Sequence, residues 1–538
     1  MTRTARRPLL LAALALLAAV CPPPARAADS PAAQWVVVTA PAFRGAVQPL
    51  VRHRKAQGFR AVVVQTTDVL DAKQIAAGDA DRLRRHVNQL CRDFKGPSYV
   101  LLVGAVAAGQ LDDPAGKVAP ALRGTVSRMK GQPSDNGYGC PGEGLLPTAA
   151  VGRFPVRTAK EAEQMVQKTL AYENDTKPGE WRRRITVLAG VPAYNPFVDR
   201  LVESLAMARF DKLDPSWSGR AIYHNPTSRF CVPDEDLHER ALEYVQAGEG
   251  FTLYLGHSDP SGFWGGKARY LNRDDWATLK IARGQGVFAT FGCNGCQLTP
   301  GDEGYGVAAA RNPHGPVAVL GSHGIAFAAM VQLAADGLFQ GGFAGKTPGR
   351  LGDVWLRVKE GLARGKIDDI SYRLLDAVDG DSKIPQATQR LEHLEMFVLL
   401  GDPALKLQTL PADVKLEVSG DVMPGKEVRV TGTAPARLEG ARVRLTLERP
   451  PGSPPAGLRP LPKEPAEARA RVMRENHEKA NRVVVETKEL TVKGGKFEAA
   501  LRLPEEAAWP RVIVRAYAAT ERAEGLGVAA LPVVRPKE

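Results

Sequence analysis

Two short apolar segments of this chain each end in a side chain capable of acid–base or nucleophilic chemistry. Residues 251–255 are followed by Gly-His257, and residues 287–291 are followed by Gly-Cys293. Both segments are rich in β-branched and aromatic residues and stop at glycine, which is typical of buried parallel strands. In open α/β sheets, functional residues gather beyond the carboxyl ends of such strands. We therefore expect His257 and Cys293 to lie side by side.

An imidazole next to a thiol forms a base and a nucleophile. The imidazole lowers the pKa of the thiol and carries a proton to the leaving group, as in cysteine peptidases. The glycines before His257 and Cys293 leave room for a substrate backbone and allow amide N–H groups to face a developing oxyanion. A lone histidine or a buried cysteine is more often structural, so the prediction depends on both residues ending strands.

Other segments of the chain follow an order that is similar to a known family. They are WVVVTAPAF at 35–43, YVLLVG at 99–104, SDNGY at 134–138, VGRFP at 151–155, KTLAYE at 168–173 and LLGDPAL at 399–405. Together with Gly-His257 and Cys293, this order resembles the gingipain family of cysteine peptidases, in the caspase-like clan. The resemblance implies hydrolysis of protein or peptide substrates, with Cys293 as nucleophile and His257 as proton carrier.

Two departures from the family pattern and one rival base keep alternatives open. Ser258 stands where gingipains usually have glycine, which would narrow the cleft beside the base. The segment Cys293-Asn-Gly-Cys296 offers two thiols; Cys293 closes the strand and takes the family position best, and Cys296 is the alternative. His323, at the end of a third strand, is a rival base.

The carboxylate that orients the histidine in gingipains has no evident equivalent. The corresponding region, 185–199, has no acid directly after its strand. The orienting group is then a backbone carbonyl, Asp199, or missing.

Two other functions remain possible. In Gly256-His-Ser258-Asp-Pro260, the serine follows a strand as in a nucleophile elbow, but the final glycine of that motif is replaced by proline. This disfavours a serine hydrolase that uses Ser258. The missing acid and Ser258 also fit a catalytically inactive secretion or scaffold protein.

The alternation of strands and helices predicts a caspase-like, doubly wound, mostly parallel sheet in two tandem α/β subdomains, residues 28–180 and 181–410. From about residue 411 to 538, short strands with period-two alternation predict an immunoglobulin-like β-sandwich. A Pro-rich and charged, helix-prone stretch at about 449–482 interrupts it as an inserted arm.

Residues 1–27 have the basic, apolar and small-residue regions of a secretory signal peptide, with cleavage expected after Ala27. The protein is therefore expected to be exported, to the periplasm, the cell surface or the medium. No later stretch reaches about 18 uninterrupted apolar residues, so no membrane span is expected. Five cysteines remain, and Cys140 and Cys231 are candidates for a bridge.

Charge and motifs point away from several function classes. Loss of the four arginines in residues 1–27 lowers the formal net charge from +13 to +9. Lys and Arg are spread without a recognised nucleic-acid motif, and the run Arg182–Arg184 is expected to be a solvated lead-in to a strand. We predict no nucleic-acid partner and no cofactor, because nucleotide-binding and zinc signatures are missing. A structural calcium ion is possible, although no dense run of oxygen ligands supports it.

Overall fold

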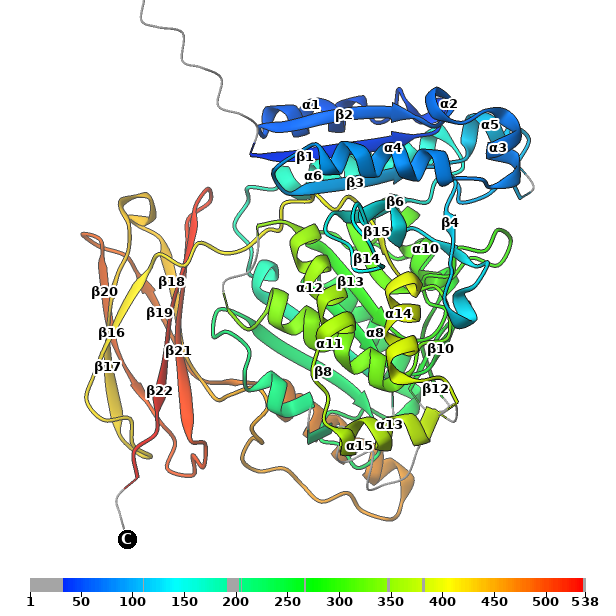
Figure 1. The fold of residues 1–538 in the computed structure, drawn as a ribbon. Coiled ribbons are helices and arrows are strands. Elements are labelled where there is room, and N and C mark those ends of the chain that lie inside the picture. The colour runs from blue at the N-terminus through cyan, green and yellow to red at the C-terminus, as the bar shows by residue number, and fades with distance from the viewer. Residues whose placement is uncertain are drawn as a thin grey trace, which may run out of the picture.

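A ten-stranded sheet forms the centre of the molecule (Figure 1). The computed structural model describes residues 32–109, 111–190, 203–204, 206–265, 268–345, 349–379 and 383–535. Along the sheet the strands are β2 (Phe59–Gln65), β1 (Ala33–Thr39), β3 (Ser98–Val103), β6 (Ala150–Phe154), β15 (Phe397–Leu400), β14 (Ala318–Ser322), β13 (Gln285–Phe291), β9 (Glu249–Leu255), β7 (Arg184–Gly190) and β8 (Ser218–His224). Among the described pairings within this sheet, only that of β14 with β15 is antiparallel.

Helices cover both faces of this sheet, as the predicted doubly wound architecture requires. One face carries α1 (Gln48–Ala56), α6 (Ala159–Asn174), α8 (Leu237–Gln246), α9 (Arg273–Thr278) and α10 (Tyr305–Arg311). The other carries α3 (Ala72–Ala77), α4 (Asp81–Arg92), α11 (Ala328–Gly342), α12 (Leu351–Arg364) and α14 (Gln386–Met396). Because helices cover both faces, inner strands such as β3 and β6 are buried throughout, whereas the edge strand β2 is only partly buried.

Further helices and short strands lie in the connections between these elements. They are η1 (Pro41–Phe43), α2 (Thr66–Val69), α5 (Pro114–Lys117), β4 (Leu122–Arg123), η2 (Ser127–Met129), β5 (Pro133–Ser134), η3 (Asn136–Gly139), η4 (Glu180–Arg183), η5 (Asp234–Asp236), β10 (Ser258–Asp259), β11 (Gly262–Gly265), β12 (Ala268–Asn272) and α13 (Asp369–Asp379). None of the helices in the described part of the chain combines the length and the apolar character that crossing a bilayer needs.

The two predicted α/β subdomains share this single sheet, and β15 joins them. Leu400 in β15 pairs with Arg153 in β6, and the other edge of β15 pairs with β14. Just beyond β15, the carboxylate of Asp402 accepts a hydrogen bond of 2.7 Å from the buried guanidinium of Arg54 in α1. Arg54 also pairs with Glu173 at the end of α6, at 2.8 Å. The two halves therefore form one packed unit.

The C-terminal region consists of two antiparallel sheets over a common apolar core (Figure 1). One sheet has β16 (Lys415–Ser419), β17 (Glu427–Thr433) and β20 (Lys496–Arg502); the other has β19 (Val484–Thr491), β18 (Arg442–Glu448), β21 (Arg511–Ala519) and β22 (Glu524–Pro532). η6 (Ala436–Leu438) lies in the β17–β18 connection. Alternation of buried and exposed residues, as in β17, agrees with the predicted sandwich. Its immunoglobulin-like character stays a prediction.

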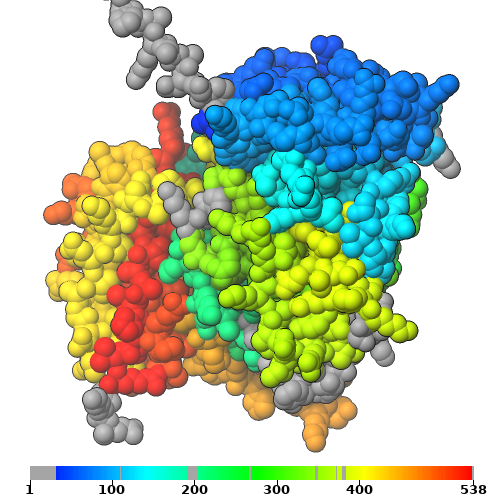
Figure 2. Space-filling model, in the orientation of Figure 1, coloured from blue at the N-terminus to red at the C-terminus, as the bar shows by residue number. Residues whose placement is uncertain are grey.

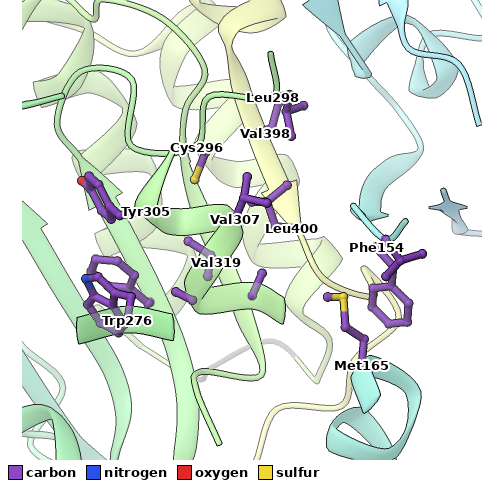
Figure 3. Close-up of a cluster of buried hydrophobic side chains, with 14 of the residues drawn as sticks. Phe154, Met165, Trp276, Cys296, Leu298, Tyr305, Val307, Val319, Val398 and Leu400 are labelled. Carbon is purple, nitrogen blue, oxygen red and sulfur yellow. The ribbon is translucent and has the colours of Figure 1, made fainter. Parts of the chain in front are cut away.

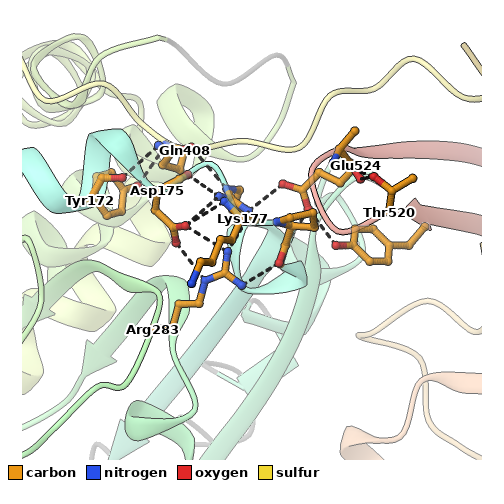
Figure 4. A network of polar contacts seen from close by, with 12 residues as sticks. Tyr172, Asp175, Lys177, Arg283, Gln408, Thr520 and Glu524 are labelled. Carbon is orange, nitrogen blue, oxygen red and sulfur yellow. Dashed lines mark hydrogen bonds and ion pairs between the residues drawn. The ribbon is translucent and has the colours of Figure 1, made fainter. Parts of the chain in front are cut away.

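A polar network ties this sandwich to the α/β unit (Figure 4). The carboxylate of Glu524 accepts a 2.7 Å hydrogen bond from Arg182 and another of 2.7 Å from the backbone N–H of Gly179. Arg182 is 2% exposed, and Arg183 pairs with Glu180 in a partly buried contact. The expectation that Arg182–Arg184 is solvated is therefore wrong, because the sandwich covers Arg182, while Arg184 donates a hydrogen bond to the carbonyl of Gly248 in the α/β unit.

The predicted inserted arm contains a helix, α15 (Ala466–Asn481), which lies beneath the α/β unit (Figures 1 and 2). It covers β8, the edge strand of the large sheet. The side-chain amide of Asn481 accepts a 2.7 Å hydrogen bond from the N–H of Ala221 and donates one of 3.0 Å to the carbonyl of Ala221. His477 lies between the hydroxyl of Tyr244, at 2.8 Å, and the carbonyl of Phe230, at 2.9 Å. The arm thus occupies backbone groups that an exposed edge strand would offer to other chains.

Candidate active site

The two predicted catalytic residues follow adjacent parallel strands in the same register. Leu255, the last residue of β9, pairs with Phe291, the last residue of β13. His257 and Cys293 each come two residues later, at the carboxyl edge of the sheet. Neighbouring strands lie about 4.8 Å apart, so an imidazole and a thiol at these positions are within reach of one another. The structure therefore brings together the two strand ends that the sequence singled out.

Ser258 connects the two loops. Its hydroxyl donates a 2.7 Å hydrogen bond to the carbonyl of Cys293. A Cβ atom on Gly292 would stand 2.1 Å from this hydroxyl oxygen, so only glycine fits there. Ser258, which stands where the family has glycine, fits here because residue 292 is a glycine. The side chain of Ser258 narrows the space beside the backbone of Cys293. A nucleophilic serine needs its hydroxyl directed at a base, whereas this one is directed at a carbonyl.

The backbone of His257 is held from two sides. Its carbonyl accepts a 2.5 Å hydrogen bond from the hydroxyl of Tyr254 and one of 3.2 Å from the N–H of Trp264. Gly256 has φ of +149°, and a Cβ there would lie 2.7 Å from the Tyr254 hydroxyl. These contacts fix the loop while His257 itself is exposed.

The two thiols of the Cys-x-x-Cys segment have opposite surroundings. Cys293 is half-buried, with Sγ 3.7 Å from the carbonyl oxygen of Ala326. Cys296 is fully buried and points into an apolar cluster (Figure 3). Cβ atoms on Gly306 and Gly321 would approach its sulfur to 2.7 and 2.6 Å, so the sulfur fills space that these glycines leave. Burial raises the pKa of Cys296, which makes it an unreactive core residue.

A tight turn separates these two environments. Asn294 has φ of +57°, a left-handed conformation that asparagine tolerates better than most residues. Its N–H donates to the carbonyl of Gly324 at 2.9 Å, and the N–H of Cys296 donates to the carbonyl of Ser322 at 2.8 Å. The loop after β14 therefore sets which thiol faces the crevice.

The rival base, His323, is 4% exposed. Its Nδ1 accepts a 2.9 Å hydrogen bond from the N–H of Leu298, and burial lowers its pKa to about 4. A ring with this pKa is a weak base at neutral pH. Asp199, the candidate orienting acid, lies outside the described residues.

Other candidate groups have structural surroundings. Asp135 forms a two-point ion pair with the buried Arg153, with both contacts at 2.7 Å. In the parts of the chain that the structure describes, no group of three or more His, Cys, Asp or Glu side chains could hold a metal ion. Cys140 and Cys231 are buried free thiols, so the bridge considered for them is not formed. Burial raises their pKa values to about 11 and about 12.

The sequence also matches a family model. The model described as Peptidase family C25 covers residues 28–408. The chain belongs to this family, the gingipain peptidases. No protein with a curated description matches the chain.

Solved structures with the same fold agree with this membership. A complex of the Porphyromonas gingivalis RgpB pro- and mature domains matches with a TM-score of 0.51 and 15% identity, over 93% of this chain and 100% of the other. A crystal structure of gingipain R (RgpB), described as an Arg-specific cysteine proteinase, gives 0.52 and 14%, over 94% and 99%. A structure described only as that of a protease matches with a TM-score of 0.50 and 12% identity, over 94% of this chain and 98% of the other. At these identities the matches show the fold, and family and fold together support a cysteine peptidase that acts on proteins.

The contacts that position the site were not evident in the sequence. Tyr254 precedes His257 by three residues inside a strand, where an aromatic residue is ordinary core. The fit of Ser258 against Gly292 joins residues 34 positions apart. The only local signal was the presence of serine where the family has glycine.

Proposed function

We propose that this protein is an exported gingipain-type cysteine endopeptidase that cleaves peptide bonds with a Cys293–His257 dyad. The observation that carries the proposal is the matched register of β9 and β13, which end at the paired residues Leu255 and Phe291, two residues before His257 and Cys293. Family membership supports the reaction class, and the position of the two strand ends supports the roles proposed for Cys293 and His257. The export part rests on the signal-peptide pattern of residues 1–27.

The reaction has two halves. In the first, the Cys293 thiolate attacks the scissile carbonyl carbon, and the carbonyl π electrons move onto oxygen, where backbone N–H groups near Gly256, His257 and Cys293 stabilise the charge. The C–N bond then breaks, and the imidazolium of His257 gives its proton to the departing amine. A thioester joins the acyl group to Cys293.

In the second half, His257 takes a proton from water, and the resulting hydroxide attacks the thioester carbon. The C–S bond breaks and the acid product leaves. The Cys293 thiolate is released, and the proton taken from water stays on His257, which restores the starting thiolate–imidazolium pair. Acyl transfer of this kind requires no redox cofactor or nucleotide. The hydrogen bond from Ser258 to the carbonyl of Cys293 connects the two loops that carry the dyad.

The environments of the other candidates favour this assignment. Cys296 is sealed in the core, and burial raises its pKa. The hydroxyl of Ser258 donates to a backbone carbonyl and is not presented as a nucleophile.

A library of mixed peptides tests the proposal. We expect the processed protein to cleave a subset of the library, iodoacetamide to inactivate it, and Cys293→Ala to abolish both cleavage and labelling at the crevice. Ser258→Ala is the matched control and should still cleave, because it removes a hydroxyl next to the thiol without removing the dyad. Labelling of Ser258 by a fluorophosphonate would instead favour the serine hydrolase. No hydrolysis and no modification at either residue would favour an inactive scaffold.

A further inference from the structure

A pocket of about 200 Å³ lies beside the candidate nucleophile, next to the loop that follows β14. Its walls include the turn after Cys293, the loop after β14 and the loop from η2 to β5. Asn294, which lines the pocket, directly follows Cys293 in the chain. The loop after β14 continues from the pocket to Ala326, whose carbonyl oxygen is 3.7 Å from the sulfur of Cys293. A substrate held at Cys293 would therefore pass close to this pocket.

His323 supplies the pocket with a hydrogen-bond donor of fixed direction. Its Nδ1 accepts the N–H of Leu298 at 2.9 Å, so this nitrogen carries no proton. In a neutral imidazole the proton then resides on Nε2. Burial lowers the pKa of His323 to about 4, which agrees with a neutral ring at physiological pH. Among the described residues no protein group pairs with Nε2, and this nitrogen is not one of the fully buried polar atoms without a partner. It therefore keeps some contact with solvent, although the residue as a whole is only 4% exposed.

The remaining walls suit a side chain with an apolar stem and an oxygen at its end. Met129, Met396 and Ile325 line the pocket, and Ile325 is 59% exposed. Gln132, whose backbone is held in the η2–β5 loop, adds an amide to the wall. None of the described lining residues is acidic.

Arg128 adds a cation, and its orientation is fixed. Its Nε donates to the buried carboxylate of Glu392 at 2.6 Å, and its guanidinium carbon lies 3.8 Å from the centre of the Phe327 ring. The ion pair with Glu392 offsets part of its charge. The pocket therefore combines directed N–H donors with the positive charge of Arg128, which Glu392 partly compensates. An acidic group that enters the pocket would meet no carboxylate on its walls.

We infer that this pocket is a substrate side-chain subsite that selects an acidic residue, glutamate above all, close to the scissile bond. The inference rests on the proposed peptidase function and adds a preference to it. An oxygen of the substrate carboxylate accepts the Nε2–H of His323, while the side-chain methylenes pack against Ile325 and the methionines. A leucine of similar size would fill the same space, shield the Nε2–H from solvent and leave it without a partner.

The test compares two peptides that differ only in Glu or Leu at the position where library cleavage shows the acidic preference. His323→Asn keeps an oxygen where Nδ1 accepts the Leu298 N–H and removes the Nε2–H. We expect the ratio of kcat/KM for the Glu and Leu peptides to fall about tenfold. A purely structural defect would lower both values together and leave the ratio unchanged, which would overturn the inference.

Two further variants guard against misfolding and nonspecific effects. Gln132→Leu changes an exposed side chain at the pocket and should lower the ratio by a smaller factor. His314→Gln, at an exposed histidine that does not line the pocket, is the matched control and should leave the ratio as in the parent protein. A similar fall in the control would count against the assignment to His323.

A measurement without turnover separates this inference from the proposed function. In full-length Cys293→Ala protein with ¹⁵N-labelled histidine, the Glu peptide should shift the ring signals of His323, and the Leu peptide should not. If the parent protein cleaves no peptide but the Glu peptide shifts His323, the subsite stands and the proposed function falls. If cleavage occurs without acidic preference and no shift is seen, the proposed function stands and the subsite falls. If neither cleavage nor a shift is seen, both are overturned.

Discussion

In the crevice beyond β9 and β13, His257 is exposed and Cys293 is half-buried, whereas under α15 the ring of His477 is 1% exposed and hydrogen-bonded through both nitrogens. Both histidines are positioned by the same large sheet: His257 follows β9, and His477 lies in the helix that covers β8. The crevice side chains are accessible to a ligand, and the loops that carry them are fixed through backbone carbonyls. The α15 contact uses its side chains to fill space and pair backbone groups. Changes in the crevice should therefore affect chemistry, and changes under α15 should affect stability.

The largest expected effect is the loss of catalysis in Cys293→Ala. We expect kcat/KM on a cleaved peptide to fall by at least about 10³-fold, because no thioester can form. The free energy of unfolding in urea should change by less than about 1 kcal/mol, since the side chain is small and half-buried. His257→Ala should behave in the same way. If Cys293→Ala cleaves and Cys296→Ser is inactive, the two thiols have been assigned in reverse.

Low pH should reduce the free energy of unfolding through Glu173, which lies away from the crevice. Burial by itself raises the pKa of this carboxyl. The hydrogen bond and the charge of Arg54, together with the N–H of Lys406, have a larger effect in the opposite direction, so the pKa is lowered to about 2. Because the folded pKa lies below the unfolded value of about 4.5, the contribution to stability is complete above pH 4.5 and is lost as the pH falls towards 2. The lost stability is about 3 kcal/mol. Urea titrations between pH 6 and 3 should show a flatter pH dependence for Glu173→Gln than for the parent protein; equal slopes would contradict this.

A loss of stability that leaves the chemistry intact is expected for His477→Ala. The substitution creates a cavity and leaves the hydroxyl of Tyr244 and the carbonyl of Phe230 without their partner. We expect the free energy of unfolding to fall by about 2–3 kcal/mol. Peptide cleavage by the folded fraction should stay within about twofold of the parent protein. A selective loss of kcat with no change in stability would mean that the α15 contact and the crevice are not separate in function.

Cys296→Ser tests the boundary between the two kinds of region, because Cys296 is three residues from the proposed nucleophile and yet belongs to the core. A hydroxyl in this apolar cluster would have poor hydrogen bonding, so we expect a destabilisation of about 1–3 kcal/mol. Cleavage should largely remain, measured below the unfolding transition. Cys296→Ala is the control: it removes the sulfur without adding a polar group, and similar losses in both variants would point to packing alone.

Local sequence patterns were sufficient for the strand ends and insufficient for the contacts around them. The runs before His257 and Cys293 are short, apolar and stopped by glycine, so both strands and their chemistry were predictable. Their pairing in register depends on the strand order of the sheet, which the two local patterns do not contain. The role of Ser258 could not be predicted from the sequence, because it depends on contact with Gly292, which follows the neighbouring strand β13.

The same limit applies to the C-terminal region. Its alternating strands predicted a sandwich, and a charged, helix-prone stretch predicted an arm, because both patterns are local. Where the arm packs depends on single contacts over long sequence separations, such as Asn481 with Ala221. The burial of Arg182 results from its contact with Glu524, and no sequence feature near residue 182 indicates it.

The smallest effect is expected for Arg474→Ala, at the rim of the α15 contact. Arg474 pairs with Glu235 at 3.0 Å and with Asp236 at 2.5 Å, but its side chain is 44% exposed. Solvent-exposed ion pairs contribute little, so the free energy of unfolding should fall by less than about 1 kcal/mol, and less still at high salt. Measured beside His477→Ala, this variant separates burial from charge: a loss as large as that of His477→Ala would mean that ion pairs at the rim, and not the packed ring, hold α15 on the sheet.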